Sequence, residues 1–159
     1  MKPEDKLRQL GIALPDYAAR PFAGAKYGKM KPYHILGPVL YLAGQVPEVD
    51  DKVIFPGQLG ATLTTEQGYE AARITAINVL AGMKHALGDL DRVAGLIRTL
   101  NFVVCASDYY DVNKVANGLT DLLAEVLGPE KGIGCRATIG VAALTQNACF
   151  ETWVEVQIA

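Results

Sequence analysis

Two apolar runs near the C-terminus carry the clearest pattern of hydrophobic and polar positions in the chain. Residues 150–159 alternate strictly, which is typical of a β-strand with one buried face. The opposite face carries a large aromatic residue among acids and an amide: Glu151, Trp153, Glu155 and Gln157. Such a face is unusual where a strand meets only water, and it favours a subunit interface or the wall of a pocket.

The other run, residues 136–144, is also predicted to be a strand. It begins with Arg136 and continues with small, mostly apolar residues. If the two runs pair as a hairpin through residues 145–149, Arg136 lies beside Glu155. That pairing would bring a guanidinium and a carboxylate to one place.

The N-terminal part of the chain predicts an arm followed by a hairpin. Residues 3–10 can form a short helix, and the prolines and glycines that follow indicate an irregular arm up to residue 29. Residues 34–46 are typical of a hairpin that turns at Gly37. A loop with one short strand at residues 52–55 is expected next.

The middle of the chain predicts two helices around one buried strand. Thr64 and Gln67 form a capping-box pattern that opens a helix running to about Leu87. The long apolar run of residues 93–106 suits a central strand that is covered on both faces. A second helix is predicted from about residue 107 to 127.

This order of elements predicts an α+β fold (an α/β two-layer arrangement) in which one mixed sheet carries two helices on one face. We expect one domain over residues 1–159, with residues 1–29 as its N-terminal arm. Two helices cover only one face of such a sheet, so the face with Trp153 is left to solvent or to other subunits. Its composition favours other subunits, and the protein is expected to associate with itself.

Charge and composition narrow the classes of function. With 159 residues, a net charge of -2 and a pI near 5.7, the chain lacks the basic balance of proteins that grip nucleic acid, which is not an expected partner. No apolar run approaches the roughly 20 residues that span a bilayer. The first residues lack the apolar core of a signal peptide. We therefore expect a cytoplasmic protein with no membrane partner.

The same composition argues against a bound metal or nucleotide. The three cysteines and two histidines do not have the spacing of metal ligands, so no metal site is expected. The glycines form no phosphate-loop or dinucleotide pattern, which counts against a nucleotide cofactor. The chemistry must therefore come from other side chains.

Arg136 is the strongest single candidate. A guanidinium offers a planar fork that matches a carboxylate, so Arg136 at the edge of a small-residue pocket suits a site for a small carboxylic acid. From spacing alone, an arginine in a surface salt bridge is the commoner case. Glu155 is either a structural partner of Arg136 or a group that orients water, and the spacing does not choose between them.

Two further positions have both a functional and a structural explanation. Asn117 is followed by a glycine inside a predicted helix, which costs helix stability. A specific contact of the Asn117 amide would explain that cost, and so would a simple helix irregularity. Gly44, after a predicted strand, could expose backbone N–H groups to an anion or form a bulge.

Together these residues resemble the RidA/YjgF family of reactive-intermediate imine deaminases, which also carries the names endoribonuclease L-PSP and translation inhibitor. The match runs from about residue 30 to the end of the chain, and the arm resembles the extension of a longer subgroup. The pieces that carry it are Ala43-Gly-Gln-Val-Pro47, Asn78-Val-Leu80, Val115-Ala-Asn117, the run from Arg136 to Leu144 and the run from Val154 to Ala159.

The resemblance implies a chorismate-mutase-like fold and a homotrimer with clefts between its subunits. It implies that Arg136 holds a substrate carboxylate, that Glu155 positions or activates water, and that Asn117 and the backbone near Gly44 complete the cleft. The further wall residues are Ala43, Thr138 and Tyr33. The implied activity is hydrolytic deamination of small reactive 2-imino or enamine carboxylic acids to keto acids and ammonia, without a metal or an organic cofactor.

Three positions depart from the family pattern. Ala43 stands where family deaminases carry Ser, and Thr138 stands where they often carry Cys. The family's active-site Tyr has only Tyr33 or Tyr27 as counterparts. These changes leave open a larger or differently shaped imine, enamine or lactam-like substrate. A non-catalytic carboxylate-binding or regulatory protein of the same fold is a second alternative, and an endoribonuclease a third.

Overall fold

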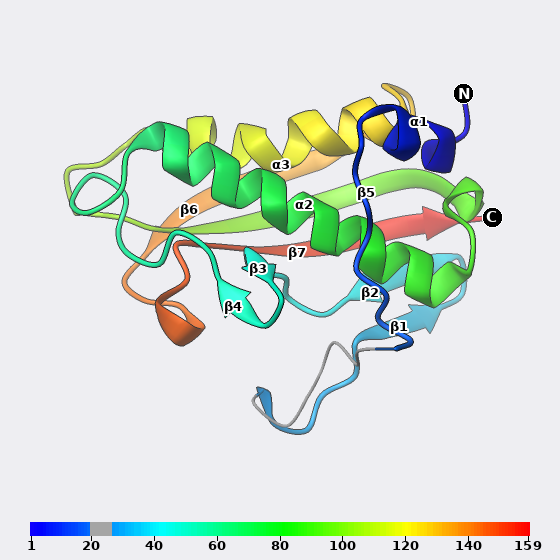
Figure 1. Ribbon diagram of the computed structural model, residues 1–159, viewed down its shortest axis with the longest axis horizontal. Coiled ribbons are helices and arrows are strands. Elements are labelled where there is room, and N and C mark those ends of the chain that lie inside the picture. Colours follow the sequence, from blue (N-terminus) through cyan, green and yellow to red (C-terminus); the bar gives the residue numbers. More distant parts are fainter. Residues whose placement is uncertain (20–26) are drawn as a thin grey trace.

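A mixed sheet forms the centre of the molecule. The computed structural model describes residues 1–19 and 27–159, so part of the predicted arm lies outside the described residues. Five strands run in the order β1-β2-β7-β5-β6 (Figure 1). β5 and β6 pair in parallel and the other neighbours are antiparallel, which confirms the predicted mixed sheet. The bounds are β1 Tyr33–Leu36, β2 Val39–Leu42, β5 Val93–Val104, β6 Cys135–Val141 and β7 Phe150–Ile158.

The predicted hairpin between the two C-terminal runs is wrong. β5 lies between β6 and β7: Arg136 on β6 is opposite Thr99 on β5, and Thr99 is opposite Val154 on β7. The reason is a crossover, because the helix α3 (Val112–Leu127) carries the chain back before β6 begins parallel to β5. Arg136 and Glu155 therefore do not meet within one chain.

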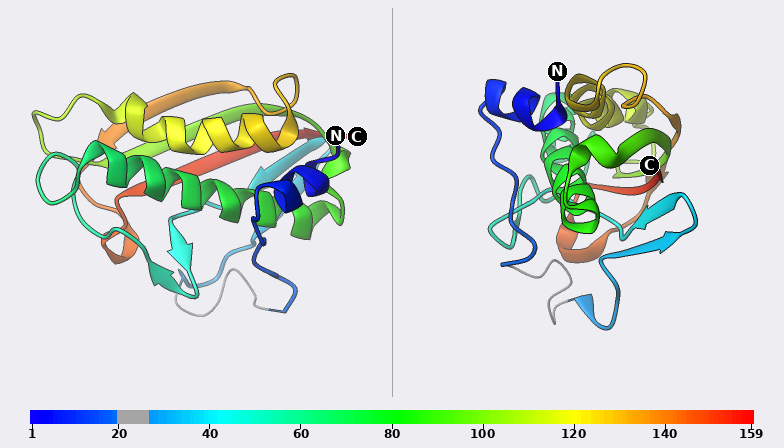
Figure 2. Two further views of the ribbon diagram at one scale, coloured as in Figure 1. Left: turned by 45° about the horizontal axis from the view of Figure 1, so that its top comes forward. Right: turned by 90° about the vertical axis from the view of Figure 1, so that its right-hand side faces the viewer.

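Two helices cover one face of the sheet, as predicted. α2 spans Thr65–Leu87 and begins with the predicted capping box, in which Thr64 and Gln67 bond each other's backbone. α3 lies beside α2 on the same side of the sheet (Figure 2). The core between the layers is apolar and includes Leu40, Leu80, Leu119, Phe150 and Val154.

α3 begins at Val112, later than the predicted start near residue 107. The residues before it form a loop that is held against the start of α2, because the Tyr109 hydroxyl lies 2.7 Å from the Thr65 hydroxyl. Leu59 also bonds this loop, since its carbonyl accepts a hydrogen bond from the Ala106 N–H at 2.9 Å. Tertiary contacts thus override the local preference for an earlier helix start.

The N-terminal arm packs on the helices. α1 (Pro3–Gln9) contacts α3, and its Leu7 is buried. The Glu4 carboxylate accepts hydrogen bonds from Lys84 Nζ at 2.8 Å and from the Leu90 N–H at 3.0 Å. Partial burial opposes ionisation, but these hydrogen bonds outweigh it and lower the pKa of Glu4 to about 2. At neutral pH the charged Glu4 therefore ties the arm to the end of α2.

A small hairpin and an open sheet face complete the fold. β3 (Glu48–Val49) and β4 (Lys52–Val53) pair through a two-residue turn with positive φ at Asp50 and Asp51, the conformation of a type I′ turn. The sheet face opposite the helices exposes large side chains, and Trp153 on it is 51% exposed. Among the described helices, none combines the length and the apolar character needed to cross a membrane.

Candidate functional site

Arg136 lies near the start of β6, an edge strand of the sheet, and its side chain reaches α3. Its Nη1 donates to Asn117 Oδ1 at 2.9 Å and to Thr120 Oγ1 at 3.0 Å, and its Nη2 donates to the Asn113 carbonyl at 3.4 Å. All three acceptors are neutral. Within the part of the chain that the structure describes, no carboxylate forms an ion pair with Arg136. The structure thus brings Arg136 and Asn117 together and leaves the guanidinium charge uncompensated.

The glycine after Asn117 has a structural cause. A Cβ on Gly118 would lie only 1.9 Å from the Tyr69 carbonyl oxygen of α2, so only glycine allows the two helices to approach this closely. The cost in helix stability that the sequence indicated is explained by this helix contact. The bond from Arg136 to the Asn117 amide is an additional feature of the same turn of α3.

Thr138 belongs to a polar cluster between the sheet and the helices. Asn101 Nδ2 donates to Thr138 Oγ1 at 3.3 Å, and Thr152 Oγ1 donates to Asn101 Oδ1 at 2.7 Å. Asn101 and Thr152 are fully buried, so this cluster is satisfied internally. Thr138 thereby orders the sheet next to Arg136.

Gly44 does not lie beside Arg136 but lines a cavity of about 450 Å³. Glu151 and Trp153 of β7 line this Gly44 cavity, and the indole Nε1 donates to Glu151 Oε2 at 2.7 Å. The indole also packs on Phe102, with ring centroids 5.0 Å apart. A Cβ on Gly44 would lie 2.9 Å from Glu151 Oε2, so glycine is needed for the carboxylate to take this position. The other described lining residues are Tyr27, Met30, Val46 and Thr145.

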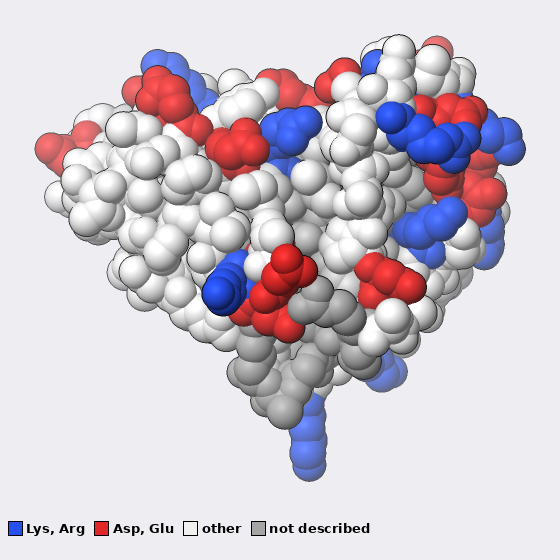
Figure 3. Space-filling view, viewed as in Figure 1, with Lys and Arg blue, Asp and Glu red and all other residues white. Residues whose placement is uncertain are grey.

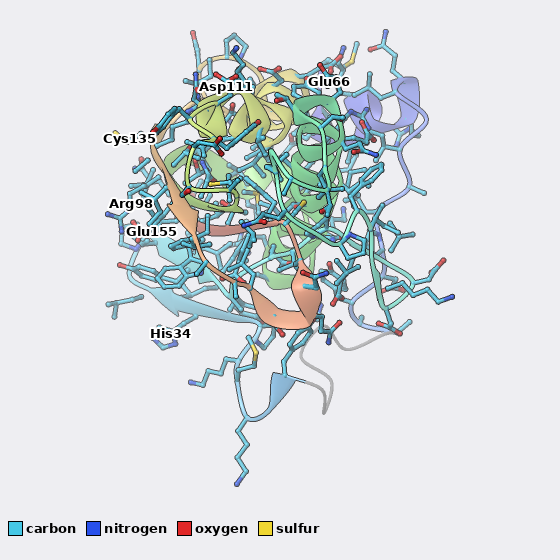
Figure 4. All side chains as sticks on the ribbon, turned by 90° about the vertical axis from the view of Figure 1, so that its left-hand side faces the viewer. His34, Glu66, Arg98, Asp111, Cys135 and Glu155 are labelled. Carbon is cyan, nitrogen blue, oxygen red and sulfur yellow. The ribbon has the colours of Figure 1, made fainter. Side chains whose placement is uncertain are left out.

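Glu155, the carboxylate that the sequence favoured, has a different partner. Its Oε1 accepts a hydrogen bond from Arg98 Nη2 at 2.7 Å, and Figure 4 shows the two side chains next to each other. It is not among the described residues that line the Gly44 cavity. Glu151 does line that cavity. Alternation placed Glu151 and Glu155 on one face of the strand but could not say which of them an arginine neutralises.

The remaining candidates for the wall of the site are Tyr33, Tyr27 and Ala43, and they differ in their position relative to the Gly44 cavity. Tyr33 packs edge-on against His85 of α2, with ring centroids 5.8 Å apart, and is not among the described lining residues of the Gly44 cavity. Tyr27 does line it, and its hydroxyl donates to the Glu48 carboxylate. The Ala43 N–H donates to the Pro32 carbonyl at 3.0 Å, which positions the chain just before Gly44.

Three free thiols and one carboxylate cluster are further candidate groups, and the exposed thiol, Cys135, directly precedes Arg136 on β6. Burial raises the pKa of Cys149 to about 11 and also raises the pKa of Cys105, so both stay protonated at neutral pH. In the described part of the chain, one carboxylate group is compact enough to share a cation, and it consists of Glu4, Asp89 and Asp91. Glu4 in that group already accepts from Lys84.

Comparison with known proteins decides the family. Residues 4–152 match the model of a family described as "YjgF/chorismate mutase-like, putative endoribonuclease". The chain belongs to the YjgF family. The match starts inside the arm, well before residue 30, where the sequence resemblance was expected to begin.

Relatives of the YjgF chain extend over nearly its whole length. It is 38% identical over 152 residues to Protein TCP17 of Trypanosoma cruzi, covering 96% of this chain and 91% of the relative. The crystal structure of Atu1372, a protein of unknown function from Agrobacterium tumefaciens, has a TM-score of 0.86 and 33% identity, covering 98% of this chain and 91% of that one. A crystal structure from Shewanella oneidensis MR-1, described as "a putative endoribonuclease", has a TM-score of 0.89 and 29% identity. The match covers 99% of this chain and 100% of that one.

The candidate site of this YjgF chain therefore consists of two separate parts. Arg136 and Asn117 lie together on the helix side of the sheet edge, because Arg136 is opposite the buried Thr99. Glu151 alternates with the buried Thr152, so it lies on the open face, two strands away. One chain alone does not bring the guanidinium and this carboxylate into contact.

Proposed function

We propose that this protein deaminates small reactive 2-imino or enamine carboxylic acids by hydrolysis, giving keto acids and ammonia. The observation that carries the proposal is the state of Arg136, whose hydrogen bonds go only to the neutral groups of Asn117, Thr120 and Asn113. These bonds hold the guanidinium in place without cancelling its charge. A carboxylate ligand can therefore gain a charged, two-pronged interaction there.

The reaction needs little beyond an anchor and an oriented water. Water adds its oxygen to the imine carbon and gives one proton to the nitrogen. The second proton of the water then passes from the new hydroxyl to the nitrogen, and the C–N bond breaks to release ammonia as the C=O bond forms. Holding the substrate by its carboxylate beside such a water supplies proximity, and one carboxylate can carry the proton. No metal or organic cofactor enters these steps.

Two carboxylates compete for the water-orienting role. Glu155 is the residue that the family resemblance implied, and Glu151 is the one in the Gly44 cavity. We assign the role to Glu151, because Glu155 already pairs with Arg98 at 2.7 Å and Glu151 lines the Gly44 cavity. The Trp153 N–H on Glu151 Oε2 leaves Oε1 available to accept a proton from water.

A homotrimer would complete the site. The two parts lie on different sides of the sheet in one chain, so the β6 edge of one subunit must meet the Gly44 cavity of another. The open face supports this arrangement, because it exposes Trp153 (51%), Ile139 (46%) and Tyr41 (40%). Large apolar side chains in one area are typical of surfaces that a partner covers.

The test is turnover of imino acids generated in situ by an amino-acid oxidase, read as ammonia and keto-acid release. Wild type is compared with Arg136→Ala at matched oligomer content. We expect acceleration by wild type and loss of at least about a hundredfold in the variant, since each hydrogen bond to a charged group is worth roughly 1.5–3 kcal/mol.

The same protein samples distinguish a deaminase from a non-catalytic binding protein and from a nuclease. If wild type binds carboxylates through Arg136 but turns over none of the imino acids, small or large, the protein is a binding or regulatory member of the fold. Cleavage of RNA that weakens as salt rises would instead support the nuclease named in the family description.

A further inference from the structure

The proposed reaction leaves one part of the substrate without a binding site. The carbon that water attacks carries three groups: the carboxylate, the nitrogen and a side chain. Arg136 is the proposed anchor for the carboxylate, and Glu151 serves the water and the nitrogen. The side chain must then lie in the rest of the Gly44 cavity. With a volume of about 450 Å³, this cavity is within the range of sites for drug-sized ligands and exceeds the needs of the simplest imino acids.

The rest of the Gly44 cavity is uncharged. Figure 3 shows acidic and basic side chains mixed over the face of the molecule that carries α2 and the arm. Among the described residues that line the cavity, by contrast, Glu151 is the one charged group. Met30 and Val46 provide apolar walls there, and Thr145 a neutral one. Because Glu151 would repel an acidic side chain, these walls favour an apolar one.

Trp153 gives the cavity a flat aromatic wall in a fixed position. Phe102 packs against the indole with the ring centroids 5.0 Å apart and the ring planes tilted by 55°. The indole N–H is bound to Glu151 Oε2 at 2.7 Å. These two contacts hold the ring, yet 51% of the residue is exposed. An aromatic ring that is held in place but half uncovered can pack a second ring at little cost in conformational entropy. Met30 adds a thioether, which also favours aromatic partners.

We propose that the Gly44 cavity holds the side chain of the imino acid and that Trp153 selects an aromatic ring there. The inference rests on the proposed function for the reacting group, but the ring pocket itself can be tested without turnover. It gives Trp153 two separable roles, because the N–H positions Glu151 and the ring determines specificity. The preferred substrates are then 2-imino acids derived from aromatic amino acids.

The first test compares the imino acids of phenylalanine, cyclohexylalanine and alanine. A D-amino-acid oxidase generates each one from the D-amino acid, and its amount is adjusted until all three form at one rate. Phenyl and cyclohexyl groups are similar in size, but only phenyl has an aromatic face. We expect kcat/KM for the phenylalanine imine to be about tenfold above that for the alanine imine and about threefold above that for the cyclohexylalanine imine.

Two substitutions at one position separate the ring from the N–H. Trp153→Phe loses the N–H but keeps a ring, so it should slow all three reactions and retain the preference for phenyl over cyclohexyl. Trp153→Leu loses both groups, and that preference should disappear. Tyr41→Leu is the matched control, because Tyr41 is a 40% exposed aromatic residue of the same sheet that is not among the described lining residues. It should leave the preference unchanged.

Binding of stable carboxylic acids tests the ring pocket apart from catalysis. 3-Phenylpropionate and propionate carry the same carboxylate, and neither can be hydrolysed. Trp153 is the one tryptophan in the sequence, so its fluorescence reports on the cavity directly. We expect 3-phenylpropionate to change the emission of wild-type protein and to bind about tenfold more tightly than propionate.

The outcomes distinguish the ring pocket from the deaminase. Turnover of all three imino acids without a preference for the phenylalanine imine would overturn the ring pocket and leave the deaminase proposal standing. Absence of turnover together with tighter binding of 3-phenylpropionate would do the reverse. A Trp153→Leu protein that still prefers phenyl over cyclohexyl would show that Trp153 does not select the ring.

Discussion

Arg98 on β5 and Arg136 on β6 lie on neighbouring strands but have opposite surroundings. In the strand register Arg98 is opposite Cys135, whereas Arg136 is opposite Thr99, one position further along. That single step turns the two side chains to different faces of the sheet. Arg98 meets Glu155 on the open face, and Arg136 meets only neutral acceptors of α3.

The comparison explains why we propose Arg136, and not Arg98, as the anchor for a ligand. A guanidinium that already pairs with a carboxylate has little attraction left for an anion. A guanidinium held by neutral amide and hydroxyl oxygens keeps its full charge in a defined orientation. The four experiments below test this difference, beginning with the largest expected effect.

Removing the charge of Glu151 should have the largest effect. We expect Glu151→Gln to lower keto-acid release about a hundredfold, because a group that carries a proton contributes roughly 10²–10⁴ in rate. Glu155→Gln should stay within about threefold of wild type, since its carboxylate serves Arg98. Initial rates at matched oligomer content measure both. A large loss in Glu155→Gln with activity kept in Glu151→Gln would return the catalytic role to Glu155.

Replacing each arginine by lysine tests the shape of the anchor. Arg136→Lys keeps a positive charge but loses the planar fork, and we expect the KM for an imino acid to rise about tenfold. Arg98→Lys should leave KM unchanged, because that residue only balances Glu155. Steady-state kinetics on the same substrate measures both values. Equal effects of the two substitutions would contradict the distinction between the two arginines.

Gly44→Ala should disturb the carboxylate without removing it. The new Cβ would lie 2.9 Å from Glu151 Oε2 and 3.2 Å from Trp153 Nε1, so both groups must move. We expect about a fivefold loss of rate and a destabilisation of about 1 kcal/mol. Gly95→Ala is the matched control, because a Cβ there meets nothing within 4 Å. Denaturant unfolding, near-ultraviolet circular dichroism and initial rates measure these effects, and a wild-type signal with full activity in Gly44→Ala would contradict them.

The smallest effect is expected for the Arg98–Glu155 pair itself. The two side chains are 53% and 27% exposed, so solvent screens their attraction. A double-mutant cycle with Arg98→Ala and Glu155→Ala, followed by urea unfolding, should give a coupling free energy below about 1 kcal/mol. A coupling above about 2 kcal/mol would mean that another subunit covers the pair and excludes water from it.

Much of the fold could be predicted because its signals are local. The capping box at Thr64 and Gln67 and the alternation in residues 150–159 each lie within a few residues of sequence, and the structure confirms both. The hairpin that turns at Gly37 is also confirmed, with φ of 57° at that glycine. The order of the last two strands could not be read in the same way, since it depends on where α3 returns the chain.

For the candidate site, the sequence could predict which residues to consider but not all of their neighbours. Arg136 and Asn117 are far apart in the sequence, but each lies in a recognisable family piece, and their hydrogen bond agrees with a shared site. The family resemblance favoured Glu155, and alternation alone could not show that Glu151 lines the Gly44 cavity, because both lie on one face of one strand. Tyr33 and Tyr27 could not be separated either, since their packing depends on α2 and on the Gly44 cavity.

The sequence by itself determined which segments form helices and strands and which family the chain resembles, because caps, periodicity and short motifs act over a few residues. Tertiary structure alone decided which charges meet. The α3 crossover inserted β5 between β6 and β7, and one step of register then separated Arg98 from Arg136. Such pairings arise from contacts distant in sequence, and no local pattern contains them.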